Sequence, residues 1–182
     1  DIKSNTWDTV MSELGVKYNV ESKMVRSMYV QRGMNAENVC LSFYYSDYIT
    51  IKYNSLGKMQ WTARYNGTGN GRDKPRAIAV DKIGNVYVTG GSDDTSFYSD
   101  YATIKYNSEG LEQWLVRYNG PADFWDVAYA IAVDNEGNVY ITGTSDGSGN
   151  DFATIKYNSN GLEQWIARYS GNNSGWEQAN AI

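Results

Sequence analysis

The chain has 182 residues, long enough for a substantial hydrophobic core, and it carries a net charge of −5. This acidic balance argues against binding a polyanion such as nucleic acid through the overall electrostatic field. The sequence has no histidine, so it lacks the commonest general base and metal ligand, and a single cysteine, Cys40, excludes an internal disulfide. No apolar run reaches the length of a membrane-spanning helix.

Aromatic residues and glycines are both abundant. Phe, Trp and Tyr make up 14% of the chain, and 18 glycines stand beside only two prolines. Aromatic side chains favour strands and glycines allow tight reversals. The composition therefore predicts an all-β protein of short strands.

The N-terminal segment, residues 1–46, is expected to form a degenerate first blade or a cap. Within it Asn38–Phe43 (NVCLSF) alternates as a strand does, Ser27–Val30 (SMYV) is a candidate inner strand, and Trp7 belongs to a possible outer strand. A short capping helix over Asp8–Leu14 is the alternative, because apolar residues stand four apart there.

Residues 47–182 contain a repeated block of 20 residues. The second and third copies agree at 15 of the 20 positions, and the three copies cover Tyr48–Gly67, Tyr101–Gly120 and Phe152–Gly171. A second block alternates with the first: AIAVDKIGNVYVTG returns as AIAVDNEGNVYITG, with 11 of 14 positions identical. The spacing is 53 residues from Ile78 to Ile131 and 51 from there to Ile182. Self-similarity of this kind indicates a repeat architecture.

Each period is expected to form four strands joined by tight turns. Residues alternate in NVYITG, ATIKY and EQWLVRY, whereas AIAVD is a short apolar run. Two hairpins in about 50 residues are typical of a β-propeller blade. We therefore predict an all-β chain of about 3 to 3.5 four-stranded antiparallel blades with the last one truncated, the AIAVD strand innermost and the Trp-containing strand outermost.

These blocks resemble the bacterial and archaeal SBBP β-propeller repeat, whose blades read AIAVDxxGNVYVTG followed by DYxTIKYNxxGxxxW. The resemblance covers about residues 38–182 and implies a propeller in a secreted or surface-attached protein. The AVDxxGNVYV part is also similar to NHL repeats, which are binding platforms. The interval from Gly110 to Trp114 resembles the tryptophan-docking motif of quinoprotein propellers, in which the Trp packs between blades.

The loops at the two ends of the predicted blades differ in how well their sequences agree between repeats. The turns DKIGN, DNEGN, NSLG, NSEG and NSNG are nearly constant, whereas the loops expected at the opposite rim vary. Variable loops on a rigid scaffold carry recognition, so we predict a ligand-binding surface for sugar or peptide there. Its candidate residues are Trp125, Trp176, Phe97, Tyr98, Asp93, Asp94, Asp123 and Asp146. The alternative is that both tryptophans pack over blade edges.

Residues that recur in register are interpreted as structural. Trp61, Trp114 and Trp165 are predicted to dock one blade against the next. The repeated Lys52, Lys105, Lys156, Arg64, Arg117 and Arg168 are expected to pair with Asp81 and Asp134 across blades. The Asp-rich loops lack the regular ligand spacing of a calcium loop. The sequence therefore indicates no metal, no cofactor and no catalytic residue.

Three functions follow as hypotheses. The first is a non-catalytic binding module at a bacterial or archaeal cell surface, with a protein or glycan as partner and neither nucleic acid nor membrane insertion. The second is an assembly unit whose open blade edges pair between chains. The third is a propeller enzyme such as a lyase, glycosidase or quinoprotein, which the missing histidine disfavours. An open arc of blades predicts a homodimer or further blades in a larger chain.

Overall fold

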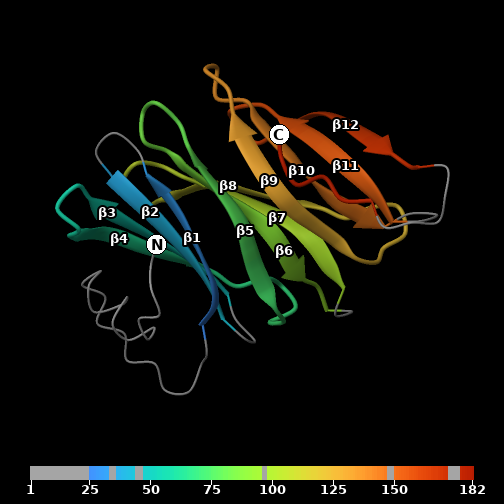
Figure 1. The fold of residues 1–182 in the computed structure, drawn as a ribbon, viewed down its shortest axis with the longest axis horizontal. Helices are drawn as coiled ribbons and strands as arrows, with labels where there is room; N and C mark the ends of the chain where they lie inside the picture. Colours follow the sequence, from blue (N-terminus) through green and yellow to red (C-terminus); the bar gives the residue numbers. More distant parts are fainter. Residues whose placement is uncertain (1–24, 33–35, 44–46, 96–97, 147–149, 172–176) are drawn as a thin grey trace.

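A computed structural model describes residues 25–32, 36–43, 47–95, 98–146, 150–171 and 177–182 of the chain. These residues form twelve strands and no helix. The strands lie in three four-stranded sheets, here called blades 1 to 3 (Figure 1). Blade 1 contains β1 (Val25–Arg32), β2 (Ala36–Phe43), β3 (Tyr48–Asn54) and β4 (Met59–Tyr65). Blade 2 contains β5 (Asp73–Val80), β6 (Val86–Asp93), β7 (Ser99–Tyr106) and β8 (Glu112–Tyr118), and blade 3 contains β9 (Asp126–Val133), β10 (Val139–Asp146), β11 (Asn150–Tyr157) and β12 (Glu163–Tyr169).

Every blade is an antiparallel meander in which the strands are paired in chain order. The tight turns follow from their Asx and Gly residues. In the β3–β4 turn, the Asn54 side chain accepts the backbone N–H groups of Leu56 and Lys58, and Gly57 takes a positive φ of 72°. The predicted all-β, four-stranded antiparallel class is confirmed.

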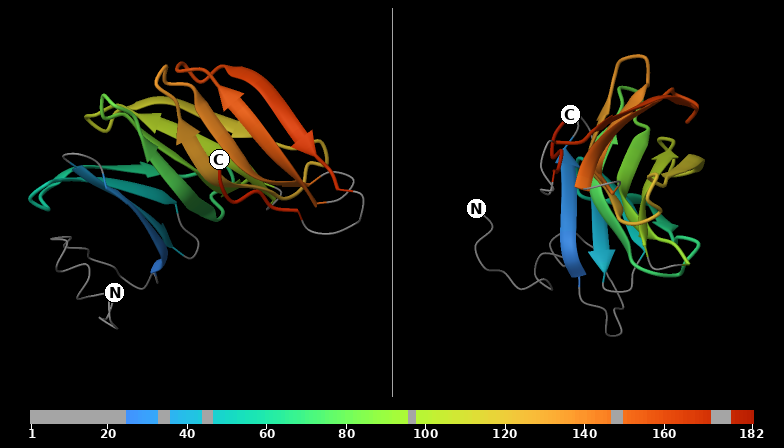
Figure 2. Two further views of the ribbon diagram at one scale, coloured as in Figure 1. Left: turned by 45° about the horizontal axis from the view of Figure 1, so that its top comes forward. Right: turned by 90° about the vertical axis from the view of Figure 1, so that its right-hand side faces the viewer.

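The blades stack face to face, each turned relative to the one before (Figure 2). The first strand of each blade contacts the previous blade, so β5 packs on β1 and β2 while β9 packs on β5, β6 and β7. The last strands, β8 and β12, carry many exposed residues. This places the AIAVD segment innermost and the Trp-containing strand outermost.

The hydrophobic core lies between the blades rather than within one sheet. One cluster joins Tyr48 and Tyr65 of blade 1 to Val86, Val88 and Ile104 of blade 2. A second joins Tyr87 and Tyr101 of blade 2 to a set from blade 3 that comprises Ala128, Val139, Ile141, Ala153, Ile155 and Tyr157. Burying apolar area between neighbours is what makes each blade depend on the next.

Blade 1 extends across residue 46, where the sequence analysis divides the chain. The sheet of blade 1 combines β1 and β2, which lie before that point, with β3 and β4 after it. Residues 177–182 follow blade 3 and form no strand. The predicted capping helix over Asp8–Leu14, and Trp7, lie outside the described residues. Over the ranges that the structure describes, no helix is long and apolar enough to cross a membrane.

Candidate functional site

Two aromatic side chains of the β8–β9 loop meet one from the β6–β7 loop at the variable rim. The ring of Tyr98 lies 4.4 Å from that of Phe124 and 6.3 Å from that of Trp125, edge to face in the second pair. Phe124 and Trp125 are each 40% exposed. We call these three residues the rim cluster. They form an accessible apolar surface supplied by two loops, and Tyr98 and Phe124 are 26 residues apart in sequence.

Acidic residues shape the loops that hold the rim cluster. The carboxylate of Asp94 accepts the backbone N–H of Tyr98 at 3.1 Å. Asp123 adopts a left-handed φ of 50°, and its carboxylate accepts the side-chain amide of Asn119 at 2.5 Å. The backbone N–H of Asp146 donates to the carbonyl of Trp125 at 3.1 Å. Carboxylates therefore border the aromatic surface and partly fix its conformation.

The other predicted ligand-binding residues are not part of the rim cluster. Asp93 is only 5% exposed, and its carboxylate accepts the backbone N–H of Arg72 at 3.0 Å, so it connects the end of β6 to the loop before β5. Burial, followed by the nearby charge of Asp151, raises the pKa of Asp146. Phe97 and Trp176 lie outside the described residues. The structure thus brings Tyr98, Trp125, Asp94 and Asp123 into one region and buries Asp93.

A recurring carboxylate supports each loop that crosses from one blade to the next. Asp126 is fully buried and accepts the backbone N–H of Gly120 at 2.6 Å, and Asp73 does the same for Gly67 at 2.7 Å. Burial raises the pKa of both carboxyls, against the lowering effect of these hydrogen bonds. This recurring hydrogen bond was not predicted from the sequence, although its signal is visible as an acidic residue six positions after each glycine. Glu177 completes the series with Gly171.

A partly buried polar network also joins neighbouring blades. The guanidinium of Arg117 donates to the hydroxyl of Tyr65 in blade 1 at 2.9 Å, to the hydroxyl of Ser92 at 2.7 Å and to the carboxylate of Asp100 at 2.8 Å. The same network recurs at the next boundary with Arg168, Tyr118, Ser145 and Asp151. The prediction that repeated Lys and Arg residues pair with Asp81 and Asp134 is wrong. The three arginines pair with other carboxylates, and Lys52 and Lys105 donate to carbonyls.

A repeated tryptophan and lysine of one blade donate hydrogen bonds to the same backbone carbonyl of the following blade. Trp61 Nε1 and Lys52 Nζ both donate to the carbonyl of Ser108 at 3.0 Å. Trp114 and Lys105 repeat the arrangement with the carbonyl of Ser159, at 3.1 and 3.0 Å. Trp165, the third of the series, is 42% exposed on blade 3.

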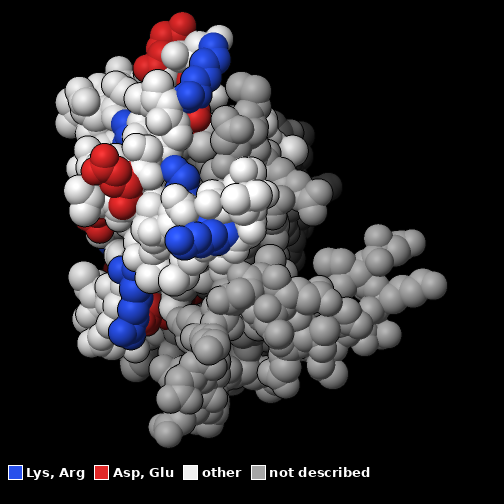
Figure 3. Space-filling model, turned by 90° about the vertical axis from the view of Figure 1, so that its left-hand side faces the viewer, with Lys and Arg blue, Asp and Glu red and all other residues white. Residues whose placement is uncertain are grey.

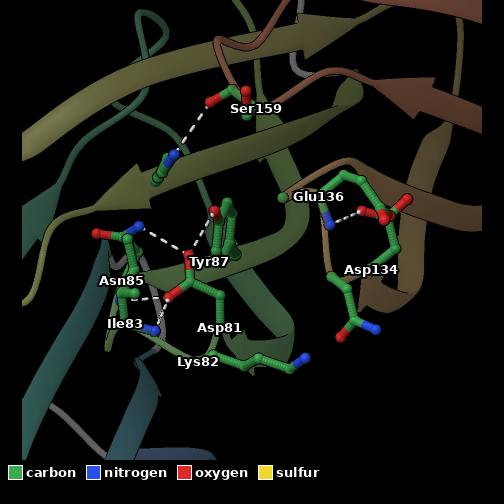
Figure 4. A pocket seen from close by; sticks show the side chains of 11 residues that line it. Asp81, Lys82, Ile83, Asn85, Tyr87, Asp134, Glu136 and Ser159 are labelled. Atoms are coloured by element: carbon green, nitrogen blue, oxygen red, sulfur yellow. Dashed lines mark hydrogen bonds between the residues drawn. The ribbon is translucent and has the colours of Figure 1, made fainter.

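A pocket of about 180 Å³ opens at the opposite, constant rim between blades 2 and 3. Figure 4 shows that Asp81 points toward Asn85 and the hydroxyl of Tyr87, which donates to its carboxylate at 3.1 Å. Asp134 repeats these contacts with Asn138 and Tyr140. Because the polar groups satisfy one another in two successive blades, we interpret this pocket as a product of the repeat.

Charge is mixed on the surface at the left of Figure 1. There, basic and acidic side chains alternate, with no broad patch of a single sign among the coloured residues (Figure 3). The described residues contain no group of three or more His, Cys, Asp or Glu that could hold a metal ion. The rim cluster is therefore taken as the candidate site.

The fold and the repeated interblade contacts define the class of this protein as a partial β-propeller. The model of the SBBP β-propeller repeat matches residues 60–98 and 126–152. Over these residues the chain therefore contains SBBP β-propeller repeats. Its similarity to NHL repeats and quinoprotein blades stays a prediction.

One curated relative is the regulatory protein FlaEY of Caulobacter vibrioides, 30% identical over 114 residues. The match covers 55% of this chain, and it spans 12% of the length of that relative.

Proposed function

We propose that this chain is a non-catalytic recognition module that binds a carbohydrate at a cell surface through the rim cluster. The observation that carries the proposal is the meeting of Tyr98, Phe124 and Trp125, two of them 40% exposed, on loops held by a rigid propeller. Large exposed aromatic groups that gather in one place mark interaction sites more often than scattered ones do.

The chemistry of the rim suits a sugar. Aromatic faces offer an apolar, electron-rich surface against which the C–H face of a pyranose ring stacks. The carboxylates of Asp94 and Asp123 border that surface and accept hydrogen bonds, as sugar hydroxyls require. A net charge of −5 disfavours polyanionic ligands, so neutral glycans are expected to bind better than sulfated ones. The surface location rests on what the repeat resemblance implies.

An oligosaccharide array tests the proposal with wild-type protein and Trp125→Ala. We expect binding to a subset of neutral glycans and a loss of at least about tenfold in affinity in the variant. Leu111→Ala is the matched control, because Leu111 is 60% exposed but lies in a turn of the constant rim.

A protein ligand is the rival outcome, and a peptide array run in parallel distinguishes it. Binding to peptides alone, again lost in Trp125→Ala, would keep the rim as the site and replace the ligand class. Binding that Trp125→Ala and Tyr98→Ala leave unchanged would remove the rim cluster from the function.

A further inference from the structure

The innermost strand of each blade carries one residue that has no counterpart in the strand beside it. In β5 this residue is Arg76, because the residues on either side of it are paired with Gly90 and Thr89, which are adjacent in β6. In β9 it is Tyr129, by the same break in register. Each is the extra residue of a β-bulge, a feature that redirects a side chain out of the regular alternation and often occurs beside functional sites.

The bulge residue differs between blades 2 and 3, whereas most of the inner strand does not. β5 reads DKPRAIAV and β9 reads DVAYAIAV, so the last four residues are identical and the bulge residue changes from Arg to Tyr. A side chain that served only to pack the blades would be expected to recur, as Arg117 and Arg168 do. Variation on a repeated scaffold instead indicates a position that serves recognition.

The two bulge side chains meet between blades 2 and 3. β5 and β9 are neighbouring inner strands (Figure 1), and the guanidinium carbon of Arg76 lies 5.5 Å from the centre of the Tyr129 ring. A guanidinium in this position is attracted to the electron-rich face of the ring. Both residues are half-buried, so part of the pair is accessible from solvent.

Arg76 differs from the other arginines whose side chains the structure describes, because it forms no ion pair with a described residue. Arg64, Arg72, Arg117 and Arg168 each pair with an aspartate. The Nε of Arg76 is buried and has no hydrogen-bond partner within the described ranges. Buried donors in folded proteins are nearly always paired, and a bound water or ion commonly completes the exceptions. The stacked guanidinium therefore presents a donor that requires an acceptor from solution.

The chemistry of the pair suits a carboxylate. The Nε–H and one terminal N–H of a guanidinium are parallel donors that match the two oxygens of a carboxylate. Stacking on Tyr129 holds the guanidinium plane, so little conformational freedom is lost on binding. The net charge of −5 disfavours more highly charged anions such as phosphate dianions.

We propose that Arg76, held flat by Tyr129, binds the carboxylate of a small organic acid at the inner strands of blades 2 and 3. The carboxylate oxygens accept the Nε–H and a terminal N–H of Arg76, and the Tyr129 ring supports the guanidinium. The site lies on strands rather than on the loops of the rim cluster, and it is independent of the proposed carbohydrate binding. Trp125→Ala should therefore leave carboxylate binding unchanged.

Proton–nitrogen correlation NMR of the arginine Nε–H groups tests the proposal directly. A buried Nε–H exchanges slowly with water and gives a resolved signal, which Arg76→Lys identifies by its disappearance. We expect this signal to shift saturably as a carboxylate is added at constant ionic strength, with a dissociation constant of about 1–10 mM. Glucuronate and N-acetylglycine are the two probes, because they represent sugar acids and peptide carboxylates. A response to one probe alone assigns the source of the carboxylate, and equal responses assign the site to carboxylates in general.

Variants separate the fork of donors from charge and from packing. Arg76→Lys should weaken binding at least about tenfold, followed through the backbone amide of Tyr129, because an ammonium group lacks the parallel pair of donors. Tyr129→Leu should weaken binding about two- to fivefold, because it keeps an apolar contact but removes the aromatic face. Arg72→Lys is the matched control and should bind as wild type, since Arg72 is paired with Asp93 and its side chain is 45% exposed.

Several results would overturn the proposal. One is an Arg76 Nε signal that does not move with either carboxylate up to about 50 mM, or that moves equally with sodium chloride. Another is inorganic phosphate that binds more tightly than both carboxylates. A third is an Arg76→Lys or Tyr129→Leu protein that is folded by circular dichroism and binds as tightly as wild type. Where Arg76→Lys does not fold, the wild-type titration and Tyr129→Leu decide.

Discussion

The indole N–H of Trp114 lies 3.1 Å from the carbonyl oxygen of Ser159 and ties the outer strand of blade 2 to the outer turn of blade 3. Lys105 donates to the same carbonyl at 3.0 Å, and the ring covers Gly161. Two donors and one steric contact converge on a single turn. The relative orientation of successive blades is therefore set at their periphery as well as in the core.

Replacing Trp114 with Ala should destabilise the protein much more than the same change at Trp165. Trp114 loses its hydrogen bond and its packing against the next blade, a cost of about 2–4 kcal/mol in the free energy of unfolding. Trp165 is 42% exposed, so its removal should cost less than about 1 kcal/mol. Urea unfolding at low protein concentration measures both. Equal losses would show that Trp114 acts only within its own sheet.

Arg117→Ala should be strongly destabilising, whereas Arg64→Ala should be nearly neutral. Arg117 joins Tyr65, Ser92 and Asp100 in a partly buried network, and removing it leaves Asp100, whose pKa burial already raises, without its cation. We expect a loss of about 2–4 kcal/mol. The Arg64 side chain is 67% exposed beside Asp47, so its pair is worth about 0–1 kcal/mol.

Arg117→Lys separates the geometry of this network from its charge. Lysine keeps the positive charge, but its ammonium group lacks the planar guanidinium with which arginine reaches three acceptors. The variant should therefore recover less than half of the stability lost in Arg117→Ala, measured by thermal unfolding of the two proteins side by side. Full recovery by lysine would mean that charge alone holds the two blades.

Gly110→Ala and Gly57→Ala should differ by the cost of a clash with tryptophan. Both glycines have positive φ, 83° and 72°, so both variants bear a similar backbone cost of about 1 kcal/mol. Only at Gly110 does the new methyl group meet the Trp61 ring, at 2.6 Å. The extra destabilisation should be about 1–3 kcal/mol. Chemical denaturation measures the stability of both variants. Equal stabilities would contradict the steric contact between residue 110 and Trp61.

Asp126→Asn should gain stability relative to wild type as pH rises. Burial raises the pKa of Asp126 above its ordinary value of 3.8, so the native state binds the proton more tightly than the unfolded chain. The stability from this group is full below the ordinary pKa and is lost as pH rises through the raised value. Asparagine is neutral throughout and keeps an oxygen for the N–H of Gly120.

Asp134→Asn provides a control of opposite sign. Hydrogen bonds, first that from the side chain of Asn138, lower the pKa of Asp134. Its contribution is therefore present above pH 3.8 and lost as pH falls through the lowered value. Urea unfolding between about pH 3 and 8 should show the difference from wild type growing in opposite directions for the two variants. Parallel curves would contradict the assigned pKa shifts.

Much of the fold was predictable because each strand is marked locally. Alternating residues in NVYITG and EQWLVRY, separated by Asx-Gly turns, indicate strands and hairpins without any knowledge of their neighbours. Repetition then implied one unit used several times. The first blade matches the repeat less closely, because Cys40 stands where Tyr87 and Tyr140 do. Both strands predicted there, Ser27–Val30 and Asn38–Phe43, nevertheless lie within β1 and β2.

The candidate site was predictable only in part. Sequence variation indicated the rim, and it singled out Tyr98 and Trp125, but it did not include Phe124, whose ring lies closest to Tyr98. Asp93 was selected for its charge, yet it is buried against the backbone of Arg72. The direction of a loop side chain depends on backbone dihedrals such as the positive φ of Asp123, which composition does not reveal.

By itself the sequence determined the repeat, its strands and turns, and the propeller class, because these depend on patterns within a few residues or on identity between copies. Only the tertiary structure decided which partners the repeated side chains take. The arginines could pair with any of several carboxylates, and the stacking of one blade on the next brought Arg117 to Tyr65, 52 residues away. Long-range contacts follow from how faces pack, and no pattern within a few residues specifies that packing.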